Sequence, residues 1–148
     1  MKRIIFILIL SFSFLSCNSQ AGKMVIVEYP YNVYVDKFIE DADKYGIDAR
    51  KHIDSLYAIV TKPNIKKHQL GGVFVFEGKV AIGLNEGIQL DTLVMKATIY
   101  HELGHWVLKK GHSQDKNDIM CSPAPQSFYM WADNRKWNDA VKKLFLEN

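Results

Sequence analysis

The sequence predicts a small α+β protein that folds as a single domain. The chain has 148 residues, and the roughly 130 that follow an N-terminal export segment suit one hydrophobic core. A pattern typical of a β-hairpin lies near the middle of the chain, and apolar residues at helical spacing follow it directly. Neither an internal repeat nor a low-complexity segment divides the sequence.

Residues 1–17 are typical of a lipoprotein-type signal peptide. Residues 1–3 are Met-Lys-Arg, residues 4–15 are predominantly apolar, and Cys17 stands at the expected cleavage point. The apolar run is shorter than the ~20 residues that a membrane-spanning helix needs. We therefore expect a lipid on Cys17, a polar tether over residues 18–23, and an exported lipoprotein of the bacterial cell envelope, in the outer membrane or facing the periplasm. Without lipidation of Cys17 the protein would be secreted.

The domain itself spans residues 24–148, and its first half mixes one strand with two helices. Residues 24–27 predict the first strand. Residues 36–45 carry apolar side chains at helical spacing, and Gly46 predicts the end of that helix. A second helical segment is predicted from Asp48 into Leu56, and the histidine at position 52 within it is expected to be structural or exposed.

The next elements are a hairpin and, at the far end of the chain, a helix. Residues 73–76 and 80–84 predict the two strands, with Glu77 and Gly78 in the turn and the exact turn length left open by Lys79. Residues 132–146 predict a C-terminal helix whose apolar face carries Trp137, Ala140, Val141, Leu144 and Phe145.

A predicted helix that begins near Asp91 or Thr92 carries the candidate metal-binding and catalytic residues. Its apolar pattern continues without a proline into His101-Glu102-Leu103-Gly104-His105. Histidines four residues apart lie on one face of a helix, where both imidazoles can bind one ion, and the glutamate can act as a general base. This motif predicts a site with one catalytic Zn²⁺, with His101 and His105 as ligands and Glu102 as the catalytic residue.

A catalytic zinc ion usually takes a third protein ligand. His112 would lie roughly 10 Å beyond His105 if the helix continued, so the helix must end before it. Residues 109–111, Lys-Lys-Gly, predict this end, with Gly111 in the left-handed conformation. His112, Asp115 and Asp118 are then the candidates for the third ligand.

The sequence resembles the metzincin clan of zinc peptidases, and within it the matrixins. Their pattern His-Glu-x-Gly-His-x-x-Gly-x-x-His-Ser leads into a methionine turn, and residues 101–105, 112–113 and 119–120 follow that order. This chain has six residues between His105 and His112 where the family has five, and Leu108 replaces the family's turning glycine. The resemblance is specific over residues 101–123.

The resemblance implies several further features. It implies a zincin-like, metzincin-type domain with a twisted mixed sheet, an active-site helix and a C-terminal helix behind the methionine turn. It also implies His112 as third ligand, Met120 as the floor beneath the metal, and the hairpin as the sheet edge that binds an extended peptide. The expected activity is a zinc metalloendopeptidase that cleaves protein or peptide bonds through a zinc-bound water, with Glu102 as the base.

The charge and the cysteine content limit the classes of partner that we expect for this protein. The chain carries 19 basic and 16 acidic residues, and without Lys2 and Arg3 the net charge falls from +3 to +1. We therefore expect no nucleic-acid partner. A lipidated Cys17 leaves Cys121 without a disulfide partner, so the fold must depend on its core and on zinc. We expect a monomer, held at the membrane by its lipid, that acts on a protein or peptide.

Two alternative functions use the same residues. A zinc-containing binding lipoprotein would be catalytically silent and insensitive to Glu102→Gln. An amidase that acts on cell-wall peptide would depend on Glu102 but ignore protein substrates.

Overall fold

The computed structural model describes residues 25–62, 69–122 and 131–147. These residues form one mixed α+β domain with the element order β1 (Ile26–Val27), α1 (Tyr31–Asp43), α2 (Ala49–Ile53), β2 (Ala58–Thr61), β3 (Gly71–Phe76), β4 (Lys79–Leu84), η1 (Glu86–Leu90), α3 (Thr92–Leu108) and α4 (Asn134–Leu146). The predicted signal peptide with Cys17 and the predicted tether lie outside the described residues. No helix within the described ranges is both long and apolar enough to cross a membrane.

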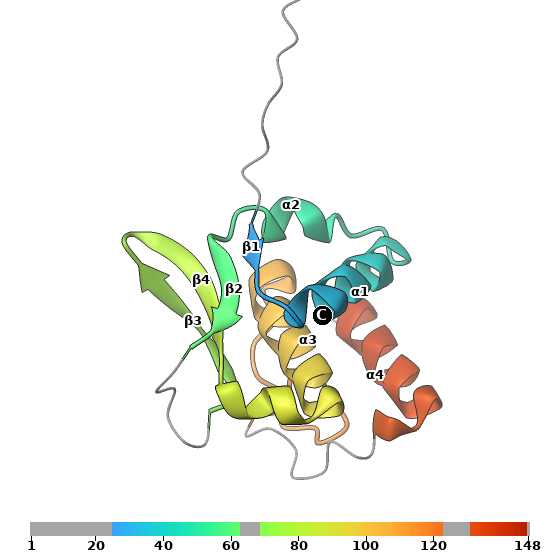
Figure 1. Ribbon diagram of the computed structural model, residues 1–148. Helices are drawn as coiled ribbons and strands as arrows, with labels where there is room; N and C mark the ends of the chain where they lie inside the picture. The colour runs from blue at the N-terminus through green and yellow to red at the C-terminus, as the bar shows by residue number, and fades with distance from the viewer. Residues whose placement is uncertain (1–24, 63–68, 123–130, 148) are drawn as a thin grey trace, which may run out of the picture.

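The four strands form one mixed sheet in the order β1-β2-β4-β3. β1, β2 and β4 run parallel, and β3 pairs antiparallel with β4 at the edge of the sheet. Figure 1 shows α1, α3 and α4 on one side of this sheet. The inner face of the sheet therefore meets the helices, and its buried side chains are Ile59, Ile82 and Leu84.

The hairpin lies where it was predicted, although β3 begins at Gly71 rather than at residue 73 and β4 begins at Lys79 rather than at residue 80. Glu77 and Gly78 both have positive φ, 49° and 72°, and Lys79 pairs with Phe76 as the first residue of β4. Two consecutive residues with positive φ match the twist of the flanking strands in a two-residue turn.

Other element boundaries differ from the prediction. α1 begins at Tyr31 rather than at residue 36, because Tyr31 and Val35 already belong to its buried face. α2 ends at Ile53 rather than in Leu56. β2 was not predicted, since its four residues are too few to show a period, yet it lies between β1 and β4.

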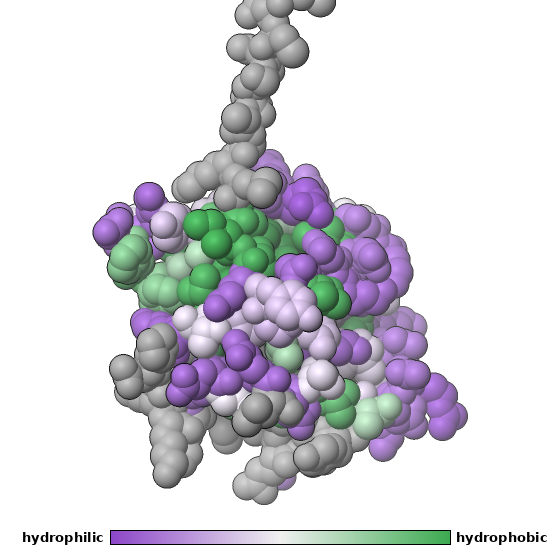
Figure 2. All heavy atoms as spheres, viewed as in Figure 1, coloured by the Kyte–Doolittle hydropathy of each residue, from purple (hydrophilic) through white to green (hydrophobic). Residues whose placement is uncertain are grey.

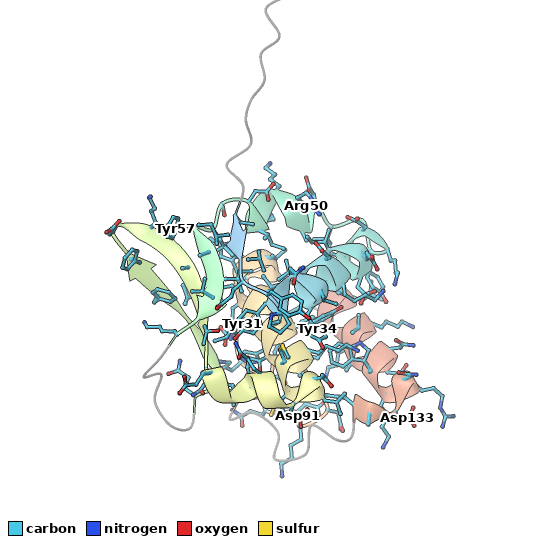
Figure 3. The ribbon with its side chains drawn as sticks, viewed as in Figure 1. Tyr31, Tyr34, Arg50, Tyr57, Asp91 and Asp133 are labelled. Carbon is cyan, nitrogen blue, oxygen red and sulfur yellow. The ribbon has the colours of Figure 1, made fainter. Side chains whose placement is uncertain are left out.

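Aromatic contacts pack α4 against α1 and α3. The Phe145 ring lies 5.2 Å from that of Phe38 on α1, and the Trp137 ring lies 5.0 Å from that of Tyr100 on α3. The helix has the predicted apolar face, and it begins at Asn134 with Asp133 as its N-cap. Figure 3 shows Asp91 and Asp133 at the starts of α3 and α4, at the same end of the molecule.

Candidate metal centre

Helix α3 carries the two histidines and the glutamate of the motif. Asp91 caps the helix and accepts hydrogen bonds from the backbone N–H groups of residues 93 and 94. His101 and His105 lie one turn apart, with ring centroids separated by 4.6 Å. The helix thus presents both imidazoles to one point, as the spacing predicts.

The chain turns at Lys109, directly after α3. Lys109 has the left-handed conformation with φ 58°, and the N–H groups of Lys109 and Lys110 both donate to the Gly104 carbonyl. The expectation that Gly111 supplies this conformation was wrong, because Gly111 does not have positive φ. The earlier turn brings the Lys110 carbonyl back onto His105.

The turn brings a third histidine to the first two. Potential ligand atoms of His101, His105 and His112 all lie within 4.8 Å of one another. The His112 ring lies 5.3 Å from that of His101 and 4.8 Å from that of His105. Three imidazoles with one open side are the ligand set of several catalytic zinc sites.

The rival ligands Asp115 and Asp118 lie outside this group and have other partners. Lys143 of α4 lies 2.7 Å from a carboxylate oxygen of Asp115 and 3.5 Å from one of Asp118. Asp118 also accepts a hydrogen bond from the Met120 N–H at 2.8 Å. These carboxylates hold the loop that follows His112.

Hydrogen bonds orient two of the imidazoles. Nδ1 of His101 lies 2.8 Å from the Ile119 carbonyl oxygen, and Nδ1 of His105 lies 2.6 Å from that of Lys110. A carbonyl oxygen can only accept, so the proton of each neutral ring is on Nδ1. The two Nε2 atoms, 3.0 Å apart, then present lone pairs to each other, and a cation between them would relieve the repulsion. Metal-bound histidines have this arrangement of carbonyl and imidazole.

The environment keeps His101 neutral. Burial, together with the neighbouring imidazoles, outweighs the hydrogen bond to Ile119 and lowers the pKa of His101 to about 4. A neutral imidazole is the form that binds a metal ion. Near neutral pH the ring can therefore bind a metal without first losing a proton.

Glu102 lies against the first residue of the edge strand. Its side chain is only 6% exposed, and burial raises its pKa to about 7. One carboxylate oxygen would lie 2.9 Å from a Cβ placed on Gly71. Gly71 thus leaves the space that the carboxylate occupies, and β3 borders the candidate site.

Met120 lies beneath the helix between the two histidines. The residue is buried, and its sulfur would lie 2.5 Å from a Cβ on Gly104. The main chain returns here as well, since the Ser113 N–H donates to the Met120 carbonyl at 2.8 Å. The methionine is thus part of the core below α3, and its role as a floor beneath a metal stays a prediction.

The sequence analysis missed Gly71, Lys143 and the carbonyls of Lys110 and Ile119. Two consecutive glycines at the start of a strand indicate close approach of another group, so Gly71 could have been noticed. Nothing in the sequence pairs Lys143 with a loop 28 residues away, and carbonyl directions depend on the turn at Lys109.

Comparisons of the chain with protein-family models, curated proteins and solved structures found no match.

Proposed function

We propose that this protein is a zinc-dependent endopeptidase of the metzincin type, anchored in a bacterial cell envelope through a lipid on Cys17. One observation carries the proposal: the Nε2 atoms of His101 and His105 face each other at 3.0 Å while both Nδ1 atoms face carbonyl oxygens. This geometry suits a cation between the rings. The neighbouring His112 supplies the third imidazole.

The donor set fits zinc. Neutral imidazoles suit borderline ions such as Zn²⁺, whereas Ca²⁺ and Mg²⁺ prefer oxygen ligands. His101, His105 and His112 would hold the ion on one side and leave a coordination position open. A bound zinc ion supplies Lewis-acid chemistry, lowering the pKa of water and polarising a carbonyl.

Glu102 is the proposed general base. Its carboxylate takes a proton from the water that attacks the peptide carbonyl, and then delivers that proton to the departing amine. Efficient proton transfer needs a pKa near the working pH, and burial raises the pKa of Glu102 to about 7. The contact with Gly71 holds the carboxylate between α3 and the sheet edge.

The edge strand β3 is the proposed binding site for an extended substrate. Among the described strands it pairs with β4 alone, so its other side can offer main-chain hydrogen-bonding groups. An extended peptide can join such an edge as an added strand. Because β3 begins at Gly71, beside Glu102, a bound peptide would run past the proposed base.

The decisive experiment compares the wild-type chain with Glu102→Gln. Both full-length proteins are loaded with zinc, their zinc content is measured, and each is incubated with an unfolded protein substrate. We expect cleavage by the wild type and a loss of at least about 100-fold in the variant, since removal of a general base typically removes 10²–10⁴-fold. The zinc content should be equal.

Two other outcomes would overturn the proposal. A folded, zinc-loaded wild type that cleaves no protein would favour the catalytically silent binding lipoprotein. Activity that depends on Glu102 but is confined to cell-wall peptides would favour the amidase.

A further inference from the structure

The sheet has a second face that no helix of the described chain covers. Along the register, Ile26, Ala58, Ala81 and Phe74 are successive partners across the four strands. Ala58 and Ala81 do not belong to the core cluster that contains their neighbours Ile59 and Ile82. Since successive side chains of a strand point to opposite faces, this row lies on the outer face, away from α3.

The outer face is apolar and has large exposed side chains at its borders. Ile26 is 54% exposed and Phe76 is 51% exposed. Between Ile26 and Phe74 the row consists of Ala58 and Ala81, which are only 4% and 1% exposed, so the accessible part of this face is formed by the larger side chains around them. In Figure 2 hydrophobic residues gather over β1 and β2, on the face viewed. We call this surface, from Ile26 to Phe76, the outer apolar face.

Lysines and a tyrosine border the same face. The Lys62 ammonium lies 4.0 Å from the centroid of the Phe74 ring, and that of Lys79 lies 4.6 Å from the centroid of Tyr57. Tyr57 in turn stacks on Phe76 at 6.4 Å. Apolar and aromatic side chains with lysines at their borders are typical of surfaces that contact the headgroup region of a bilayer.

The strand directions place one end of the outer apolar face close to the N-terminal start of the domain. β1, β2 and β4 run parallel, so their first residues, together with the last residue of β3, lie at one end of the sheet. Figure 3 shows Tyr57 at this end and Arg50 on α2 nearby. Val25, the first described residue, is eight positions after Cys17, a distance of at most about 28 Å for extended chain.

We propose that the outer apolar face lies against the surface of an anionic lipid bilayer. The inference rests on the lipid anchor in the proposed function, but not on the peptidase chemistry. A tether of this length keeps the end of the sheet close to the bilayer, and the cations bordering the face suit anionic headgroups. A second copy is a poorer occupant, because its own outer face carries the same cations and offers them no complementary charge.

In this orientation the outer face meets lipid and the helical side of the sheet, where Gly71 contacts Glu102, faces away from it. The metal centre would then be open to soluble or periplasmic proteins. The substrate class expected from this orientation is exported protein rather than lipid-embedded segments.

The test measures where single positions lie relative to the bilayer. The full-length chain is exported by a bacterial host, purified with its lipid, and reconstituted into phosphatidylcholine vesicles with or without phosphatidylglycerol. A nitroxide is attached to Ile26→Cys or Phe76→Cys, and to Val33→Cys as a matched control. Val33 is 55% exposed, like Ile26, but lies on α1. The unsubstituted chain, with its buried Cys121, is the blank.

We expect the nitroxides at positions 26 and 76 to be several-fold more accessible to oxygen than to a water-soluble nickel chelate. Position 33 should be more accessible to the nickel chelate than to oxygen. The difference in accessibility between positions 26 and 76 and position 33 should be larger in vesicles that contain phosphatidylglycerol. Replacing Lys62 and Lys79 by glutamine should remove this effect of phosphatidylglycerol on the accessibility difference.

Three results would overturn the inference. Equal accessibility at positions 26 and 33 on an anchored chain would mean that the lipid alone holds the domain. Dipolar broadening between labels at position 26, lost on dilution with unlabelled chain, would assign the face to a second copy. A chain without lipid on Cys17 that stays off the vesicles would reject both the anchor and this face. Cleavage assays are not involved, so none of these results bears on Glu102.

Discussion

Helix α3 carries residues of two polar clusters whose polar atoms are paired to different extents. On one side, Tyr100 donates to Asp41 at 2.7 Å, and Lys44 donates to the other carboxylate oxygen at 2.6 Å. On the other side, His101 and His105 turn their Nε2 lone pairs toward each other. Glu102 shares that side, and no hydrogen bond to its carboxylate occurs within residues 25–62, 69–122 and 131–147.

The two clusters also differ in their effect on pKa. Burial tends to raise the pKa of Asp41, but the hydrogen bonds from Lys44 and Tyr100 and the charge of Lys37 outweigh it, so the pKa is lowered. Burial acts unopposed on Glu102 and raises its pKa. A cluster whose polar atoms are paired with one another stabilises the fold, whereas imidazole lone pairs and a carboxylate without such partners among the described residues are suited to bind something from outside the chain.

The largest expected difference is in metal affinity. His105→Ala should weaken zinc binding by more than about 100-fold, beyond the 10–100-fold typical of residues that only orient a ligand. Tyr100→Phe, on the other side of the same helix, should leave the affinity within about twofold. Competition with a chelating dye measures both. If His105→Ala and Tyr100→Phe lose equal zinc affinity, the metal site is not confined to the histidine side of α3.

The stability of the zinc-free protein should respond in opposite directions on the two sides. A raised pKa of about 7 for Glu102 means that stability is lost as the pH rises from the unfolded value of about 4.5 through 7, by about 3 kcal/mol. Glu102→Gln should therefore be more stable than wild type at pH 8, with little gain at pH 4.5. Urea unfolding at the two pH values measures this.

Asp41 provides the opposite case. Its lowered pKa means that its contribution is present above the unfolded pKa and is lost as the pH falls through the folded one. Asp41→Asn should destabilise the protein at pH 8 by about 2 kcal/mol, the typical contribution of hydrogen bonds to a charged group. If Glu102→Gln is instead less stable than the wild type at pH 8, the proposed contrast between Asp41 and Glu102 is wrong.

A smaller effect is expected from the contact between Glu102 and the edge strand. A methyl group on Gly71 would meet the Glu102 carboxylate oxygen at 2.9 Å, whereas one on Gly72 would meet the flexible end of Gln69 at 2.7 Å. Gly71→Ala should reduce cleavage about tenfold by displacing the base, as misplacement by about 1 Å can, and Gly72→Ala should not. If both variants keep wild-type activity with normal thermal unfolding, Gly71 does not position Glu102.

The smallest effect concerns the loop that carries His112. Lys143 contacts Asp115 at 2.7 Å and Asp118 at 3.5 Å, so Lys143→Met should loosen the loop and weaken zinc affinity about threefold, as expected for a partly exposed ion pair. Lys142→Met, at an exposed position of the same helix, is the control. The difference should shrink at high salt. Equal zinc affinity in both variants at low salt would show that Lys143 has no such role.

Much of the fold could be predicted because its signals are local. The apolar pattern of α3 and the alternation of the two hairpin strands depend on neighbours in sequence, although the choice between Asp91 and Thr92 as the start of α3 and the length of the hairpin turn were left open. β2 could not be predicted, since four residues define no period and its place between β1 and β4 depends on partners far along the chain. The turn at Lys109 also escaped prediction, because a lysine with positive φ is uncommon.

By itself, the sequence determined which residues could bind a metal: the spacing of His101 and His105 places both imidazoles on one helical face whatever surrounds them. Only the tertiary structure decided that His112, rather than Asp115 or Asp118, joins them in one group. It also decided that Gly71 borders Glu102 and that Ile26 and Phe76 stay exposed at the borders of the outer apolar face. Helical spacing follows from local geometry, whereas the position of a loop, a strand edge or a sheet face depends on contacts between residues far apart in the chain.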